Sequence, residues 1–114
     1  MERKFRLTRS DDFKRVRSSG KSYAHPLLVL VTTPSQNPEA RVGITASHSV
    51  GGAVERNRAK RLLREAVKPF LMHMRADDLV LIARAPLAKG NLSQASDALK
   101  LLLNRARLLK PDHE

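Results

Sequence analysis

The chain has 114 residues, the length of one domain with a single core, and it carries no cysteine. That absence excludes disulfides, thiolate zinc sites and cysteine nucleophiles. Lysine and arginine number 22 against 11 acidic residues, giving a formal net charge of +11; a small protein with this charge repels itself unless a polyanion compensates. Among polyanions, nucleic acid is favoured over an anionic membrane or an acidic protein.

The N-terminus does not predict a targeting segment. Residues 1–6 are charged and no apolar segment follows them, so we expect no secretory signal. The longest apolar run, from Pro26 to Val31, is far shorter than the ~20 residues of a membrane span. We therefore expect a cytoplasmic protein that makes no membrane contact. Its basic N-terminus (1–6, with no role for Phe5) and its tail (110–114) are expected to be mobile.

The first predicted element is a helix over residues 10–19. Ser10 can cap its start, because a hydroxyl can accept a hydrogen bond from an amide one turn later. Phe13 and Val16 share one face, and Gly20 is a suitable stop.

Three strands are predicted next. Residues 21–25 form a short strand that Pro26 interrupts, because proline cannot donate to a ladder. The run 27–33 is continuous and rich in β-formers, which predicts a strand buried on both faces. A turn-rich loop at 34–38 then leads to a third strand at 41–47.

The second half of the chain predicts helix, strand and helix. Residues 53–74 are helical by pattern, with a kink or an end near Lys68 imposed by Pro69. Residues 79–83 form a fourth strand, and residues 92–109 carry apolar side chains at helical spacing. The order α-β-β-β-α-β-α predicts a single α+β domain over 1–114, in which helices pack on a four-stranded mixed sheet.

The helix predicted from residue 53 carries the clearest functional signal. Between residues 53 and 68 there are six basic and two acidic residues, and on a helical wheel the basic ones lie opposite the apolar ones. The excess of arginine predicts phosphate contacts, since a guanidinium can meet two phosphate oxygens at once. A solvated basic helix and a helix lying on a membrane are the alternatives. The expected RNA-facing residues are Arg56, Asn57, Arg58, Lys60, Arg61, Arg64 and Lys68.

This segment resembles a known family signature. Its sequence from Gly52 to Glu65 is Gly-Ala-Val-Glu-Arg-Asn-Arg-Ala-Lys-Arg-Leu-Leu-Arg-Glu. It is similar to the protein subunit of bacterial ribonuclease P, which has an Arg-Asn-Arg core after a Gly-x-Ala-Val turn, then Lys-Arg and Arg-Glu. The resemblance continues at residues 7–20, 41–43 and 79–86. It implies an α+β fold like that of domain 2 of ribosomal protein S5.

The resemblance also implies a function. The protein would bind the catalytic RNA of ribonuclease P and the 5′ leader of precursor tRNA, and would assist endonucleolytic removal of the leader. Catalysis is expected from the RNA subunit and its magnesium ions, so no catalytic residue, metal ligand or small-molecule substrate is expected for the protein. By position, His48 would join the RNA-binding residues, although the family usually has paired lysines there. The leader would contact Arg9, Phe13, Lys14, Arg17 and Val31.

Other activities find less support in the sequence. The acid pairs at 11–12 and 77–78 are interpreted as a helix start and a loop rather than a two-metal nuclease site. The four histidines lack metal-ligand spacing, and no acid orients His48 toward Ser47 or Ser49 as in a hydrolase. A structural RNA-binding module, such as a ribosomal protein of similar fold, remains the second hypothesis.

Overall fold

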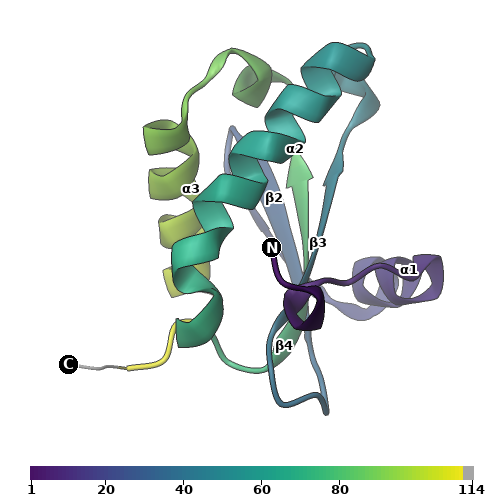
Figure 1. Ribbon diagram of the computed structural model, residues 1–114, viewed down its shortest axis with the longest axis vertical. Helices are drawn as coiled ribbons and strands as arrows, with labels where there is room; N and C mark the ends of the chain where they lie inside the picture. Colours follow the sequence, from purple (N-terminus) through teal and green to yellow (C-terminus); the bar gives the residue numbers. More distant parts are fainter. Residues whose placement is uncertain (112–114) are drawn as a thin grey trace.

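The computed structural model describes residues 1–111, with three helices and one four-stranded sheet (Figure 1). The predicted order of elements is confirmed. The elements are α1 (Ser10–Ser19), β1 (Lys21–Ala24), β2 (Leu28–Pro34), β3 (Arg41–Ala46), α2 (Ala53–Val67), β4 (Asp77–Ala83) and α3 (Leu92–Arg105). Short 3₁₀ turns connect them: η1 (Arg3–Phe5), η2 (His48–Val50), η3 (Lys68–His73) and η4 (Ala85–Lys89).

The strands lie in the order β1-β2-β4-β3. The pairs β1–β2 and β2–β4 are antiparallel, whereas β3 and β4 are parallel. A parallel pair needs a long crossover, which α2 and η3 supply. The mixed sheet predicted from the sequence is thereby confirmed.

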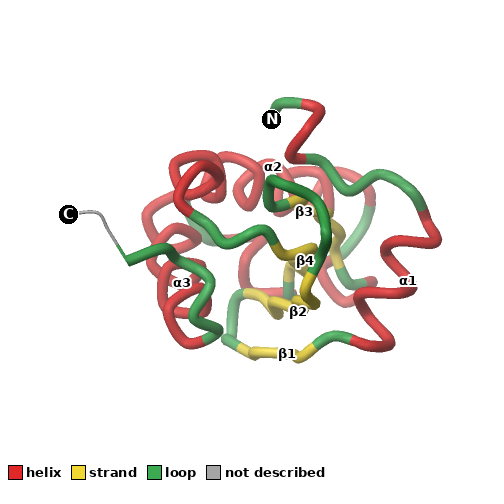
Figure 2. The backbone as a smooth tube through the Cα atoms, turned by 90° about the horizontal axis from the view of Figure 1, so that it is seen from below, coloured by secondary structure: helices red, strands yellow, loops and turns green. Residues whose placement is uncertain are grey.

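Helices cover the two faces of the sheet unequally. Figure 2 shows α3 and α1 on opposite sides of the sheet, with β1 at one edge. On the α2 and α3 face, the large core contains Leu30, Leu63, Leu81 and Leu99, all fully buried. On the other face, α1 covers a much smaller cluster of Leu7, Val16, Val31 and Val80. Helix α1 therefore has little apolar area with which to hold its position.

The observed end of α2 agrees with the prediction, whereas that of α3 differs from it. Helix α2 stops at Val67 and continues as η3 through Pro69, which agrees with the expected break. Helix α3 ends at Arg105, and the turn after it places Arg107 at a φ of 58°. Its start is fixed by a capping box between Asn91 and Gln94.

The N-terminal segment packs against the domain, which contradicts the expectation that residues 1–6 are mobile. Phe5 is only 6% exposed and belongs to the large core. The Leu7 amide donates to the Val42 carbonyl at 3.0 Å. The described part of the expected tail is also bonded, because the Lys110 amide donates to the His73 carbonyl at 2.7 Å. The remainder of that tail, 112–114, lies outside the described residues.

Candidate nucleic-acid interface

Helix α2 turns one side to the core and the other to solvent. The turn into it needs a glycine at Gly51, whose φ is +136°. The buried side consists of Ala59, Leu63, Ala66 and Val67. The solvent side presents Asn57, Lys60, Arg61 and Arg64. Within residues 1–111 these four side chains form no hydrogen bond or ion pair, so their polar groups are available to a ligand.

Arg58, by contrast, is bonded to the protein. Its Nε donates to the Ala88 carbonyl at 2.9 Å, and its Nη2 donates to the Gly90 carbonyl at 2.8 Å. Two of its five N–H donors are therefore used to join α2 to the η4 turn. The helical wheel places Arg58 with the other basic residues. In the folded protein its guanidinium is bonded to the η4 turn, a contact that the sequence did not predict.

Three other predicted RNA-binding residues lie at the ends of α2. Arg56 donates from Nη1 to the Gly51 carbonyl at 3.3 Å. Lys68 pairs with Glu65 at 3.0 Å on an exposed surface, where such a pair is worth little. His48 is exposed in η2, just before the helix.

Helix α1 leaves part of its sheet face open. Phe13 packs directly on Gly43, since a Cβ built there would lie 2.5 Å from the ring. The next row of side chains on this face lies two residues away along each strand. The residues of this row pair with one another across the sheet, and α1 does not fully cover them. This open row consists of Ala24, Val29, Thr45 and Ile82, and each is exposed or partly exposed.

The predicted leader-binding residues fall into two groups. Lys14 and Arg17 are exposed on α1, Phe13 is partly exposed, and Arg9 is exposed beside Asp11 at 3.8 Å. Val31 is only 3% exposed, under α1, so the prediction that it contacts a ligand is wrong. The partly exposed residue of β2 on the same face is Val29, two positions earlier.

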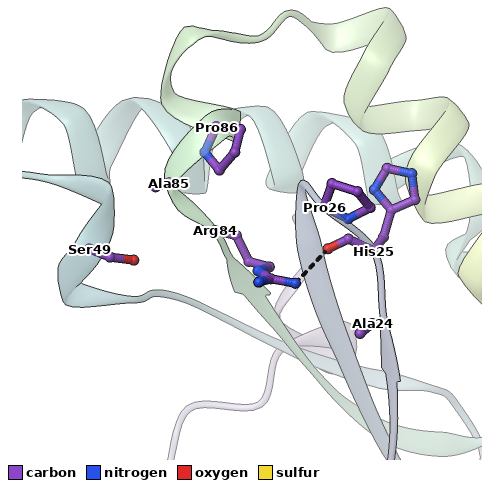
Figure 3. Close-up of a pocket in the computed structure, with 7 residues that line it drawn as sticks. All are labelled: Ala24, His25, Pro26, Ser49, Arg84, Ala85 and Pro86. Carbon is purple, nitrogen blue, oxygen red and sulfur yellow. Dashed lines mark hydrogen bonds between the residues drawn. The ribbon is translucent and has the colours of Figure 1, made fainter.

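Arg84 belongs to the same sheet face, although it was not among the residues predicted from the sequence. It follows Val80 and Ile82 at the period of two that places side chains on one face of a strand. Its Nη1 donates to the His25 carbonyl at 3.2 Å, at the rim of a pocket that Pro26, Ser49 and Pro86 also line (Figure 3). The alternation beyond Ile82 was the available signal.

The basic side of α2 and the partly open sheet face beside α1 meet at the β3 edge. A small pocket there is lined by Arg64 of α2, Phe13 of α1 and Ile44 of β3. The N-terminal residues Arg6 and Thr8 complete its wall. The two predicted contact regions are therefore neighbours on one surface.

Asp78 anchors α1 to the sheet. Its side chain is 1% exposed and pairs with Arg41 of β3 and Arg15 of α1. Burial raises the pKa of the carboxyl, but the hydrogen bonds and charges of the two arginines outweigh it and hold the pKa below its ordinary value. The prediction of a loop at 77–78 is wrong, because the arginines allow these acids to begin β4.

The described residues contain neither a metal-binding cluster nor a membrane-spanning helix. Residues 1–111 contain no group of three or more histidine, cysteine or acidic side chains that could hold a metal ion. No helix in this part of the chain is long and apolar enough to cross a membrane.

Comparison with known proteins gives consistent matches. Residues 1–107 match the family model Ribonuclease P. The ribonuclease P protein component of Chloroflexus aurantiacus is 40% identical over 111 residues, which cover 96% of this chain and 82% of the relative. That of Dehalococcoides mccartyi strain 195 is 40% identical over 114 residues, which cover 100% and 94%.

Solved structures agree with the sequence matches. The Staphylococcus aureus RNase P protein superposes with a TM-score of 0.82 at 32% identity, covering 93% of this chain and 98% of that one. The Thermotoga maritima RNase P protein gives a TM-score of 0.77 at 27% identity, covering 88% and 96%. The α+β fold expected from the sequence is thereby confirmed.

Proposed function

Because this chain belongs to the family of bacterial ribonuclease P protein components, we propose that it binds a ribonuclease P RNA and the 5′ leader of precursor tRNA, and so assists removal of the leader. The proposal rests on one observation, which is that the two basic regions lie next to each other. Arg64 of α2 and Phe13 of α1 line one pocket, so two RNAs bound at the two regions would lie next to each other.

The solvent side of α2 is the proposed contact for the catalytic RNA. Lys60, Arg61 and Arg64 bring three positive charges within about one helical turn, and none of them has a partner among residues 1–111. Structured RNA presents phosphates at close spacing, and arginine can meet two phosphate oxygens at once. Asn57 adds an amide that can donate or accept on the same side.

The open sheet face beside α1 is the proposed contact for the leader. A single-stranded RNA is suited to a groove with cationic walls and an aromatic ring on which a base can stack. Phe13 supplies that ring, and Lys14 and Arg17 supply the wall on α1. Arg84 supplies a cation beyond this row, two residues after Ile82.

We assign the chemical step to the RNA and its magnesium ions rather than to a protein side chain. Three acids of α1 and β4 already have partners in the protein. Asp78 binds two arginines, Asp77 accepts from Thr32 at 3.1 Å, and Asp12 lies 3.4 Å from Arg15. Acids held in this way stabilise the fold and are poor candidates for general-base or metal-ligand roles.

Reconstitution tests the proposal directly. The protein would be added to a bacterial ribonuclease P RNA at low magnesium, and cleavage of a precursor tRNA would be followed at its 5′ end. We expect the protein to raise the cleavage rate and to lower the magnesium requirement, because its cations reduce repulsion between the two RNAs. Unchanged cleavage by RNA that demonstrably binds the protein would instead support a structural RNA-binding module.

A matched substrate pair locates the leader contact. Precursor tRNA and mature tRNA differ only in the leader, so the ratio of their affinities isolates it. We expect the complex to favour the precursor, and Arg84→Ala to reduce this preference more than Lys89→Ala, which removes a charge from the exposed η4 turn nearby. Equal effects of the two substitutions would remove Arg84 from the proposed contact.

A further inference from the structure

A second basic pocket lies on the other side of β1 from the open sheet face beside α1, which we call the leader cleft. It has a volume of about 560 Å³ and is formed where β1, the end of β2 and the C-terminal end of α3 meet. Its walls include Lys21, Tyr23, Thr33, Asp77, Arg105 and Arg107. The volume falls within the range of about 300–1,000 Å³ typical of small-ligand sites, so it can accept a group the size of a nucleotide.

The charge of this pocket favours an anion. Lys21, Arg105 and Arg107 are exposed cations, and Asp77 is the one acid among the lining residues. The Asp77 carboxylate accepts from the Thr32 hydroxyl at 3.1 Å, and within residues 1–111 it forms no ion pair with these cations. The three positive charges are therefore not neutralised by the described part of the protein.

Tyr23 supplies an aromatic surface beside these cations. It is the single tyrosine of the chain, and its ring is partly exposed in the pocket. In the described part of the chain, the Tyr23 hydroxyl has no hydrogen-bond partner. A partly exposed ring flanked by cations is the combination that stacks on a base while the cations bind the adjoining phosphates.

The helix dipole explains only part of this arrangement. Cations in the last turn of a helix are favoured by its partial negative charge, which accounts for Arg105 at the end of α3. It does not account for Lys21 and Tyr23, which come from a strand and point to the same face two residues apart. Two elements distant in sequence therefore bring complementary groups to one place.

Strand β1 connects this pocket to the leader cleft. It is an edge strand, so RNA can pass around it. Ser22 and Ala24 share a face with Val31 and Val29, on the cleft side, whereas Lys21 and Tyr23 point to the α3 side. Figure 2 shows β1 at the edge of the sheet, between α1 and α3.

We infer that the pocket of Lys21, Tyr23, Arg105 and Arg107 is a second RNA site, which binds one nucleotide of a single strand by stacking on Tyr23 and pairing its phosphates with the cations. This inference rests on the proposed function, because it takes the protein to be an RNA-binding subunit. The nucleotide comes either from the leader, beyond the cleft, or from a single-stranded part of the ribonuclease P RNA.

Fluorine NMR can observe this site alone. Replacing tyrosine by fluorotyrosine places one fluorine in the protein, at Tyr23, because the chain has no other tyrosine. A short single-stranded RNA would be titrated while its binding is followed independently by the anisotropy of a dye on the RNA. We expect the fluorine signal to shift as the RNA binds. Bound RNA with an unmoved fluorine signal would overturn the site and leave the proposed function intact, whereas absence of RNA binding would count against both.

Substitutions test the role of the cations. In the variant Lys21→Ala with Arg107→Asn, asparagine tolerates the positive φ of 58° at residue 107. We expect this variant to lose the fluorine shift. We also expect it to lower the salt slope, which is the steepness with which the logarithm of the binding constant falls with the logarithm of the salt concentration, by about 0.7 for each phosphate contact removed. The control Lys89→Ala with Lys100→Ala removes the same charge from exposed positions outside the pocket. Equal slopes in variant and control, or a shift that persists in the variant, would overturn the inference.

Two further titrations identify the source of the nucleotide. Precursor tRNA with a long leader is compared with the same tRNA carrying a leader cut to its last few nucleotides. A shift that requires the long leader assigns the site to the leader. A shift produced by ribonuclease P RNA alone assigns it to the catalytic RNA. A fluorine signal that stays unmoved with both RNAs would overturn the inference.

Discussion

The guanidinium of Arg41 donates two hydrogen bonds to the carboxylate of Asp78 across neighbouring strands, from Nε at 3.0 Å and from Nη2 at 2.8 Å. Arg15 of α1 donates to the same carboxylate, at the Oδ2 that also accepts from Arg41 Nη2. Because the apolar cluster under α1 is small, this carboxylate is a main reason why α1 keeps its place on the sheet. The position of one wall of the proposed leader cleft thus depends on an acid within the sheet.

Replacing this acid should loosen the fold. Asp78→Asn keeps the shape but removes the charge that both arginines bind, and we expect a loss of about 2–3 kcal/mol in unfolding free energy. The loss is smaller than for a fully buried pair because Arg15 is 42% exposed and can regain water. Urea unfolding measures it. Asp97→Asn, at an exposed position of α3, is the control and should change little.

The same carboxylate predicts a specific dependence of stability on pH. Its folded pKa is lowered from 3.8, so its contribution is complete above about pH 4 and is lost as pH falls toward the folded pKa, where the native state also takes up the proton. The difference in unfolding free energy between the parent and Asp78→Asn should therefore be constant from neutral pH to about 4 and shrink below it. A difference that grows on acidification would contradict the assignment.

The solvent side of α2 should carry the salt dependence of RNA binding. Arg61→Ala with Arg64→Ala removes two cations that have no partner in the described part of the chain. We expect weaker binding of ribonuclease P RNA with a salt slope lower by about 0.7–0.9 per phosphate contact. Lys100→Ala with Lys110→Ala removes the same charge elsewhere and should leave the slope nearly unchanged. Identical slopes for the two double variants would show that only total charge matters.

Arg58 should matter for stability before it matters for RNA. Arg58→Ala deletes the bonds to the Ala88 and Gly90 carbonyls, and we expect a loss of about 1–2 kcal/mol. Arg58→Lys should restore little of it, because an ammonium lacks the fork that reaches both carbonyls. Thermal melting and RNA affinity, measured on the same samples, separate the two roles. Unchanged melting with weakened RNA binding would make Arg58 an RNA contact instead.

Phe13 should affect leader recognition specifically. We expect Phe13→Ala to reduce the preference of the reconstituted complex for precursor over mature tRNA by roughly tenfold, since stacking of a base on an aromatic ring is worth about 1–3 kcal/mol. Phe70→Ala removes a partly buried ring from η3, away from the cleft, and serves as the matched control. Equal loss of affinity for both tRNAs in Phe13→Ala would indicate a general effect on folding.

The sequence alone determined much of this protein. Local patterns fixed the order of helices and strands, because apolar spacing and the positions of glycine and proline act within a few residues. The charge of the segment from Arg56 to Lys68 and its Arg-Asn-Arg core indicated the family, which the comparisons confirm.

The tertiary structure decided which side chains are available. Arg58 and Arg61 look equivalent on a helical wheel, yet Arg58 is bonded to η4, whereas Arg61 has no partner among the residues that the structure describes. Val31 looked available until α1 covered it, and Asp78 looked like a loop residue until Arg15 and Arg41 met it. The physical reason is the same in each case: the partners are distant in sequence, and packing alone brings them together.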